Sequence, residues 1–228
     1  MRVRDDLDAV VFVGAAERRW VPSPTPGVER MMLERVGDEE AVATSFVRFA
    51  PGTHFPAHVH GLGEEFLVLE GDFRDAAGCY RAGRYLRHPP GTAHAPWSEE
   101  GCLLFVKLKQ FAPDDAAHVD CEIERMRVSA GQAPSHRTLH RFRDERVEIV
   151  DAAAGTALRV PAVAQSTELL VLEGAATVNG RRLERLGWAR LPRNTALTVR
   201  FERDARIWLK ARAVEVDRMI AAQGRMNA

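Results

Sequence analysis

The chain has 228 residues, of which 46% are apolar and 28% charged, values typical of a globular protein with a sizeable core. Lys plus Arg and Asp plus Glu both number 32, so no net charge attracts the chain to nucleic acid or to an anionic membrane, and we expect neither as a partner. The odd number of cysteines, Cys79, Cys102 and Cys121, and their wide spacing argue against a disulfide framework and favour a reducing, cytoplasmic environment.

In chain order, the first segment has a short apolar run after Asp8 that is a poor signal peptide and too short to span a bilayer. Residues 20–30 are rich in proline and are expected to run extended over the surface. From there to residue 110, short runs of β-branched and aromatic residues alternate with turn sequences such as PGT and PPGT. This pattern predicts an all-β sandwich or barrel.

An internal repeat appears when the sequence is shifted by 103 residues. Without a gap, residues 45–53 align with 148–156, 64–71 with 167–174, 88–94 with 191–197, and 104–107 with 207–210. We therefore expect two copies of one β domain. The first domain is residues 1–110. The second is residues 111–228, which begins with a linker (111–132) and ends in a short helix.

A candidate metal site lies in the first copy. Alternate side chains of a strand share a face, so His58 and His60 point the same way, and a turn at Gly61–Gly63 would return Glu64 to them. His94, which follows the turn PPGT, is a candidate third histidine. Imidazole and carboxylate ligands suit zinc, iron, manganese or nickel. The alternative is a strand that is merely rich in polar residues.

The spacing of these residues resembles the two motifs of the cupin superfamily. The first motif, G-x5-H-x-H-x3–4-E-x6-G, is matched by Gly52, His58, His60, Glu64 and Gly71. The second motif, G-x5-P-x-G-x2-H-x3-N, is matched by Gly83, Pro89, Gly91 and His94, with Ser98 in place of the asparagine. The first copy is most similar to the cupin domain of ChrR-type anti-sigma factors, and acetylacetone-cleaving dioxygenases carry a related domain.

This resemblance implies two tandem cupin barrels of the double-stranded β-helix or jelly-roll type. It also implies that His58, His60, Glu64 and His94 bind one divalent transition metal (Zn, Fe, Mn or Ni) inside the N-terminal barrel. In the first motif, six residues separate the glutamate from the last glycine. Counting back from Gly71 therefore gives Glu64 rather than Glu65 as the metal ligand. Glu65 has a counterpart in the second copy, Glu168, so we expect a structural role for it on the outer face of the strand.

The second copy has lost all four metal ligands. Their counterparts under the 103-residue shift are Pro161, Val163, Thr167 and Leu197, none of which is an ordinary ligand of a transition metal. We expect the fold to survive there without an ion. Two interpretations of this copy remain: it only completes the two-barrel core and interface, or it also keeps a pocket for an apolar ligand.

Side chains near the metal ligands are candidates for a pocket. His54, Phe66, Trp97 and Arg48 are the candidate pocket residues, and Arg48 or Lys107 would meet an anionic group if directed inward. Phe46 and Phe105 could line the same wall, but core packing is the simpler explanation for them.

Three functions are compatible with this sequence. The ChrR resemblance implies a sensor, regulatory or ligand-binding protein. No His/Cys cluster or helical domain comes before Trp20, so a complete anti-sigma factor and a sigma-factor partner are not expected. The alternative is a metal-dependent dioxygenase-type enzyme acting on a small chelating oxygenated substrate. A storage or structural cupin, with the metal as a staple, is the third. Whether the chain is an enzyme or forms a homodimer stays open at this stage.

Overall fold

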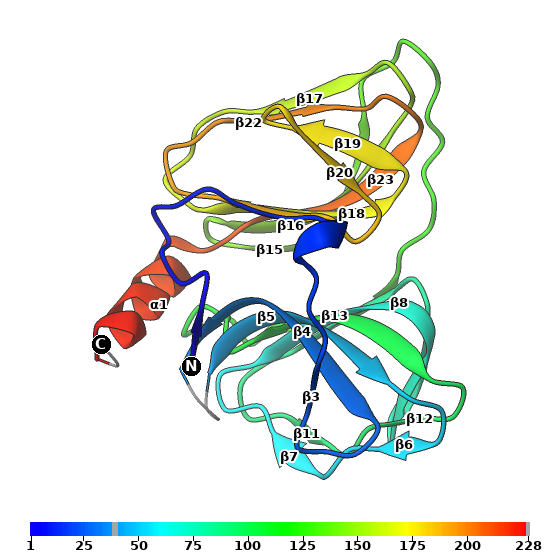
Figure 1. Ribbon diagram of the computed structural model, residues 1–228, viewed down its shortest axis with the longest axis vertical. Coiled ribbons are helices and arrows are strands. Elements are labelled where there is room, and N and C mark those ends of the chain that lie inside the picture. The colour runs from blue at the N-terminus through cyan, green and yellow to red at the C-terminus, as the bar shows by residue number, and fades with distance from the viewer. Residues whose placement is uncertain (38–40, 227–228) are drawn as a thin grey trace. The chain divides into compact units, whose positions relative to one another are not determined.

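The computed structural model describes residues 1–37 and 41–226, and the regular secondary structure of these residues is almost entirely antiparallel strands (Figure 1). The described residues contain one α-helix, α1 (Val214–Met226), and one 3-10 helix, η1 (Ala15–Glu17). The chain divides into two compact units. The first contains residues 1–5, 19–123 and 222–228, and the second contains residues 6–18 and 124–221. Within the described ranges, no helix has the length and apolar character needed to cross a bilayer.

The first unit is a barrel of antiparallel strands. Its main sheet has the order β1-β4-β5-β13-β8-β10-β14, with β3 paired to β4, β9 and β12 to β8, and β6 to β12, while β7 and β11 pair separately. Its strands are β1 (Arg2–Val3), β3 (Val21–Pro22), β4 (Val28–Val36), β5 (Val42–Phe49), β6 (Thr53–His54), β7 (His58–Val59), β8 (Glu64–Asp75), β9 (Gly78–Arg81), β10 (Arg84–His88), β11 (Ala93–His94), β12 (Trp97–Ser98), β13 (Cys102–Leu108) and β14 (Val119–Glu122).

The second unit has two sheets, with strand orders β15-β16-β23-β18-β21-β2 and β17-β22-β19-β20. Its strands are β2 (Val11–Val13), β15 (Ser135–Phe142), β16 (Glu145–Ala152), β17 (Ala157–Val160), β18 (Thr167–Glu173), β19 (Ala175–Val178), β20 (Arg181–Glu184), β21 (Trp188–Leu191), β22 (Leu197–Arg200) and β23 (Ala205–Ala211). The predicted all-β fold with two tandem jelly-roll barrels is confirmed.

The internal repeat is visible in the hydrogen-bonding register. A shift of 103 residues carries β5, β9 and β13 onto β16, β20 and β23 with identical bounds. It also carries the bulge at Val68–Glu70 of β8 onto the bulge at Val171–Glu173 of β18. A bulge adds one residue to one strand and is a specific structural feature, so its recurrence supports a common fold for the two copies.

The compact units have different limits from the domains expected at 1–110 and 111–228. Strand β14 lies in the expected linker and pairs with β10, so the first unit continues to residue 123. Residues 6–18 group with the second unit, because β2 adds to its sheet beside β21. Helix α1 covers the segment that was expected to be helical.

A glycine at the end of the cupin-like EEFLVLEG sequence permits a close approach of two strands. Gly71 has φ of 72°, and a Cβ atom there would lie 1.8 Å from the carbonyl oxygen of Gly101. Gly174, its counterpart in the second unit, has φ of 74° and a Cβ position 2.3 Å from the carbonyl oxygen of Asp204. Both positions therefore require glycine for conformational and steric reasons.

We predict that Gly71→Ala destabilises the protein by about 3 kcal/mol, the sum of left-handed backbone strain and a clash with backbone that has no free end to move. Gly52→Ala is the matched control, since Gly52 also has φ of 72° but has no atom within 4 Å of its Cβ position. It should cost only about 1 kcal/mol. Urea unfolding measures both changes, and equal losses would contradict the steric explanation.

Candidate metal centre

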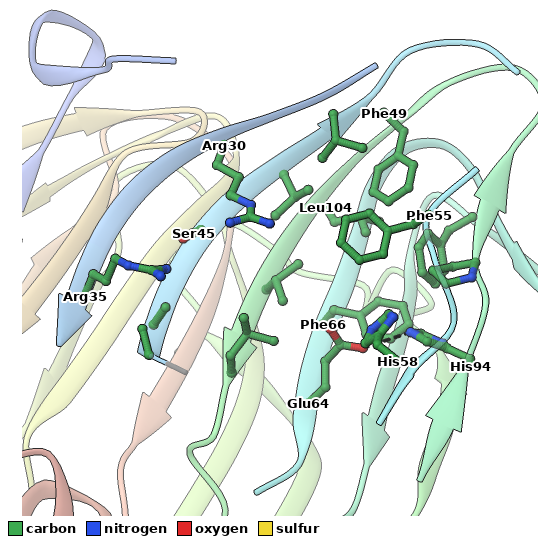
Figure 2. A pocket seen from close by; sticks show the side chains of 18 residues that line it. Arg30, Arg35, Ser45, Phe49, Phe55, His58, Glu64, Phe66, His94 and Leu104 are labelled. Atoms are coloured by element: carbon green, nitrogen blue, oxygen red, sulfur yellow. Dashed lines mark ion pairs between the residues drawn. The ribbon is translucent and has the colours of Figure 1, made fainter. Parts of the chain in front are cut away.

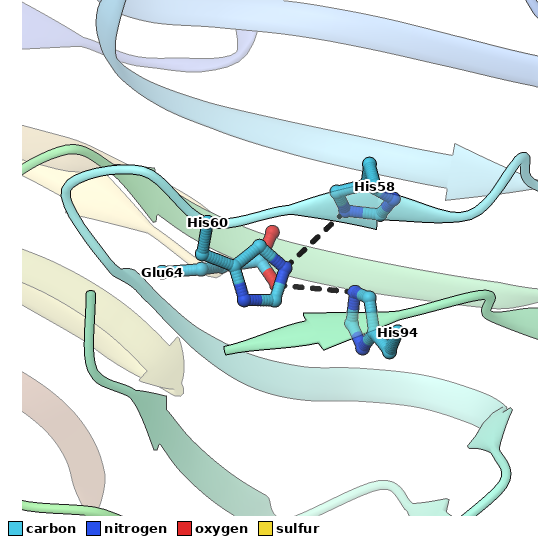
Figure 3. A group of neighbouring side chains, drawn as sticks. All are labelled: His58, His60, Glu64 and His94. Atoms are coloured by element: carbon cyan, nitrogen blue, oxygen red, sulfur yellow. Dashed lines mark hydrogen bonds and ion pairs between the residues drawn. The ribbon is translucent and has the colours of Figure 1, made fainter. Parts of the chain in front are cut away.

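The four candidate ligands come from three neighbouring strands and the turn between them. His58 begins β7 and lies opposite His94 of β11 in the antiparallel register. The N–H of His60 donates to the carbonyl of Thr92 at 2.8 Å, and the N–H of Gly63 closes a turn on the carbonyl of His60 at 3.3 Å. This turn returns the chain to Glu64, the first residue of β8, so the structure brings all four side chains together (Figure 3).

Each histidine has an acceptor behind its ring. His58 Nδ1 lies 2.9 Å from the carbonyl oxygen of Pro56, and His94 Nδ1 lies 3.3 Å from Asp75 Oδ2. His60 Nδ1 lies 3.0 Å from Thr92 Oγ1, whose own proton goes to the carbonyl of Pro89. All three acceptors therefore take a proton from Nδ1, which leaves a lone pair on each Nε2.

The free Nε2 atoms converge on the Glu64 carboxylate. Glu64 Oε2 lies 3.2 Å from His60 Nε2 and 3.5 Å from His94 Nε2, and His58 Nε2 lies 3.3 Å from His60 Nε2. One ligand atom from each residue lies within 4.8 Å of all the others. Atoms that each bind one ion at about 2.1 Å are separated from one another by distances comparable to those found here.

The carboxylate gives a direct test of the fit to a metal ion. Glu64 Oε2 is buried and has no hydrogen-bond partner among the described residues. A buried carboxylate oxygen without a partner is costly, and a bound cation removes that cost. The Nδ1 acceptors of the histidines also match the usual surroundings of metal-bound imidazoles. The residues present therefore fit a divalent transition metal.

The pKa values in the site reflect its burial. Burial, together with the charge of Asp75, raises the pKa of Glu64 to about 8. Burial, together with the neighbouring histidines, lowers the pKa of His60 to about 3 and that of His94 to about 4. At neutral pH the two histidines are therefore unprotonated, as a metal ligand must be, while the carboxyl keeps its proton until a cation replaces it.

Glu65 points away from the metal ligands, as expected for the next residue of a strand. Its carboxylate accepts from the hydroxyl of Tyr85 at 3.0 Å and from Arg87 at 2.9 Å, and Arg87 also bonds Asp115 at 2.5 Å. Glu65 is buried rather than exposed on the outer face. Its contacts are those of a structural residue.

A cavity of about 180 Å³ opens from the metal ligands into the first barrel (Figure 2). His58, Glu64 and His94 line one part of it. The walls are mainly apolar and come from β5, β8 and β13 and from the segment before β7: Ala41, Ala43, Val47, Phe49, Phe55, Phe66, Phe73, Leu104, Val106 and Leu108. The candidate metal site is therefore also the boundary of a ligand-sized space.

Among the residues proposed for the pocket, Phe66 lines the cavity and packs edge-on against His88. His54 and Trp97 are not among its lining residues; they stack on each other on β6 and β12, with ring centroids 6.1 Å apart. Phe46 and Phe105 pack together in the core, with centroids 5.6 Å apart.

The two basic residues suggested for an anionic group have other contacts. Arg48 lies outside the cavity, with its guanidinium 4.1 Å from the Trp20 ring and 3.2 Å from Glu29. Lys107 is buried and donates to Thr44 Oγ1 at 2.9 Å. On β5 the odd-numbered residues line the cavity, which is why Arg48 points the other way.

Several residues of the site were not found by sequence reasoning. Thr92 and Asp75 hold His60 and His94, and Arg30 and Arg35 of β4 line the cavity. The β4–β5 register shifts between Met32 and Glu34, so Arg30 and Arg35 share a face although one number is even and the other odd. Strict alternation along the sequence would have placed Glu34 inward instead.

In the second unit, two of the four lost-ligand positions, Thr167 and Leu197, are buried, whereas Pro161 is exposed and Val163 is partly buried. Leu197 is fully buried in a core cluster with residues such as Val150, Leu169 and Phe201. Thr167 is buried as well. Apolar packing therefore takes the place of the His94 counterpart in that barrel.

Comparison with known proteins agrees with this fold. Residues 8–112 match the family described as the ChrR cupin-like domain. Residues 8–112 are therefore a ChrR cupin-like domain of the cupin superfamily. No curated protein matches the chain in sequence.

Solved structures extend the cupin fold over both units. A bacterial pirin, YhhW from Escherichia coli in complex with nickel(II), is 14% identical with a TM-score of 0.67, covering 89% of this chain and 98% of that one. A proposed dioxygenase from Nostoc punctiforme is 13% identical with a TM-score of 0.70, covering 89% of this chain and 82% of that one. At these identities the likeness establishes the fold.

We predict that metal binding at pH 7 releases about one proton per ion, because Glu64, with a pKa of about 8, must lose its proton while the two low-pKa histidines have none to lose. At about pH 9 the release should fall close to zero. Calorimetry of metal binding in two buffers with different ionisation enthalpies measures it. A release that is the same at both pH values would contradict the role of Glu64.

The hydroxyl of Thr92 should orient His60 for metal binding. Thr92→Val removes the acceptor of the Nδ1 proton, and we expect metal affinity to fall about 10- to 100-fold. Thr92→Ser keeps the hydroxyl and should bind metal almost as tightly as the wild type. Competition against a chromophoric chelator measures the affinities, and a valine variant that binds like the serine variant would rule out this role.

Proposed function

We propose that this protein is a metal-dependent, ligand-binding cupin with a sensor or regulatory role, in which His58, His60, Glu64 and His94 bind one divalent transition metal. The observation that carries the proposal is that three of these residues also line the cavity of the first barrel. A small molecule in that cavity would lie directly beside the ion. Metal binding and ligand binding would therefore depend on each other.

The chemistry of the donor set supports zinc, iron, manganese or nickel, and a nickel(II) complex is known for the pirin of similar fold. A bound ion would supply a Lewis acid able to coordinate or polarise an oxygen of the ligand. The protein's own contribution is to present three Nε2 lone pairs and one carboxylate, and to enclose the ligand in apolar walls that limit access of water.

The second unit is proposed to act as a structural partner without a metal. Its ligand positions hold Pro161, Val163, Thr167 and Leu197, and Leu197 belongs to a packed apolar core. We therefore expect one metal ion per chain rather than two.

A dioxygenase-type enzyme is the second candidate function. It is favoured by the cavity beside the candidate metal ligands, which could admit a chelating oxygenated substrate, and a proposed dioxygenase has a similar fold. The two functions share the same metal site but differ in turnover.

Metal analysis of protein purified without chelators tests the proposal. We expect about one transition-metal ion per chain, and loss of that ion in the double variant His58→Ala plus His94→Ala. His54→Ala is the matched control, because His54 is an exposed imidazole of the same barrel that is not among the grouped ligands. Metal content unchanged in the double variant would overturn the site.

Oxygen consumption separates the two candidate functions. Iron-loaded protein with acetylacetone, a small β-diketone, should show ligand-dependent thermal stabilisation without oxygen uptake if the protein is a sensor. Sustained oxygen uptake that disappears in the double variant would instead support the enzyme.

A further inference from the structure

A second polar group lines the same cavity, away from the metal ligands. Arg30 and Arg35 of β4 both direct their guanidinium groups into it, and Ser45 of β5 lies beside them (Figure 2). In the β4–β5 register, Arg30 is opposite Val47, Arg35 is opposite Ala43, and Ser45 falls midway between these partners. The three side chains therefore form a small polar group on an otherwise apolar wall, here called the arginine pair with Ser45.

Among the residues that the structure describes, none supplies a counter-charge to Arg30. Within the part of the chain that the structure describes, it makes no hydrogen bond or ion pair, although its side chain is partly buried. Burial and the positive charge of Arg35 both lower the pKa of Arg30. A guanidinium that is removed from water beside a second guanidinium is unfavourable until an anion is bound. Arg30 is thus a partly buried cation that faces the ligand cavity, with no anionic partner among the described residues.

The bulge in β4 is what places both arginines on one face. Without the register shift between Met32 and Glu34, alternation would turn Glu34 rather than Arg35 toward the cavity. The β5 partners of Arg30 and Arg35 are Val47 and Ala43, which are four residues apart. At ~3.3 Å per residue, the backbones of the two arginines are therefore about 13 Å apart. Their long side chains extend toward each other across this distance, over Ser45 (Figure 2). This arrangement offers planar donors for bidentate binding of an anion.

Between the arginine pair and the metal ligands, the cavity is apolar. Its walls there include Val47, Phe66, Leu104 and Val106. No polar group on these four side chains could bind a polar middle segment of a ligand. The ligand should therefore have a hydrocarbon segment between two polar ends.

We propose that the ligand is a small organic acid, whose carboxylate binds Arg30 and Arg35, whose hydrocarbon segment contacts the apolar walls, and whose oxygen donor faces His58, Glu64 and His94. The last contact rests on the proposed metal-dependent function, whereas the first does not. A carboxylate fits better than a phosphate. A phosphate has more oxygens and more charge, and its additional oxygens need further hydrogen-bond donors. Beside the two guanidiniums, Ser45 is the remaining polar side chain on this wall that could supply one.

The first test uses chelator-treated, full-length protein, so that it is independent of the metal. Calorimetry compares hexanoate with hexanamide, which has the same shape without the charge, and we expect at least tenfold tighter binding of hexanoate. Hexyl phosphate is a third probe. Equal binding of hexanoate and hexanamide overturns the proposal, and so does undetectable hexanoate binding at ~10 mM or tighter binding of hexyl phosphate.

Variants assign the effect to the arginines. Arg30→Met plus Arg35→Met should abolish the preference for the acid, and Arg30→Lys plus Arg35→Lys should restore part of it. Arg48→Met is the matched control, since Arg48 is on the same sheet but outside the cavity, and it should keep the full preference. If the double methionine variant does not fold, Arg30→Gln alone should lower the preference severalfold. Survival of the preference in every folded variant would overturn the assignment.

The second test uses metal-loaded protein with 4,6-dioxoheptanoate and its methyl ester, which share a chelating diketone and differ in the carboxylate. The acid should bind at least tenfold tighter than the ester. If metal binds but acid and ester bind equally, the inference fails while the proposed function stands. If no metal binds but hexanoate is still preferred over hexanamide, the proposed function fails and the arginine site stands.

Discussion

The candidate site depends on the orientation of three imidazole rings by acceptors that lie behind them. Pro56, Thr92 and Asp75 each take the Nδ1 proton of one histidine, which leaves three Nε2 lone pairs facing one carboxylate. These acceptors come from separate segments of the first barrel, so the ligand set exists only when the barrel is folded. The burial of this set explains why the pKa of the Glu64 carboxyl is raised and why those of His60 and His94 are lowered.

The two faces of each strand separate function from structure. Glu64 faces the three candidate ligand histidines, whereas Glu65 bonds Tyr85 and Arg87 on the other side. This division explains how the second unit keeps its fold without the ligands: Glu168, the counterpart of Glu65, still accepts hydrogen bonds from Trp188 at 3.2 Å and Arg212 at 2.7 Å. The glycine that permits the close approach of two strands is also present in both units, as Gly71 and Gly174. The second copy has thus kept the structural face and lacks the candidate metal ligands.

The sequence predicted the fold, the repeat and the grouping of His58, His60, Glu64 and His94, because these depend on fixed spacings within short segments. It did not predict the cavity wall, because the inward face of a strand depends on bulges and on register with its neighbours. The bulge in β4 brings Arg35 inward, and the phase of β5 turns Arg48 outward. Likewise, β2 pairs with β21, far along the chain, and no local pattern encodes that pairing.

The central claim is that one barrel binds a metal ion through its four grouped side chains while the other does not. Anomalous diffraction from crystals grown with zinc, collected on both sides of the zinc absorption edge, tests this claim most directly. We predict a single strong peak bounded by the Nε2 atoms of His58, His60 and His94 and by the Glu64 carboxylate. No peak should appear in the barrel of residues 124–221. A zinc peak elsewhere, with none at these four residues, would contradict it.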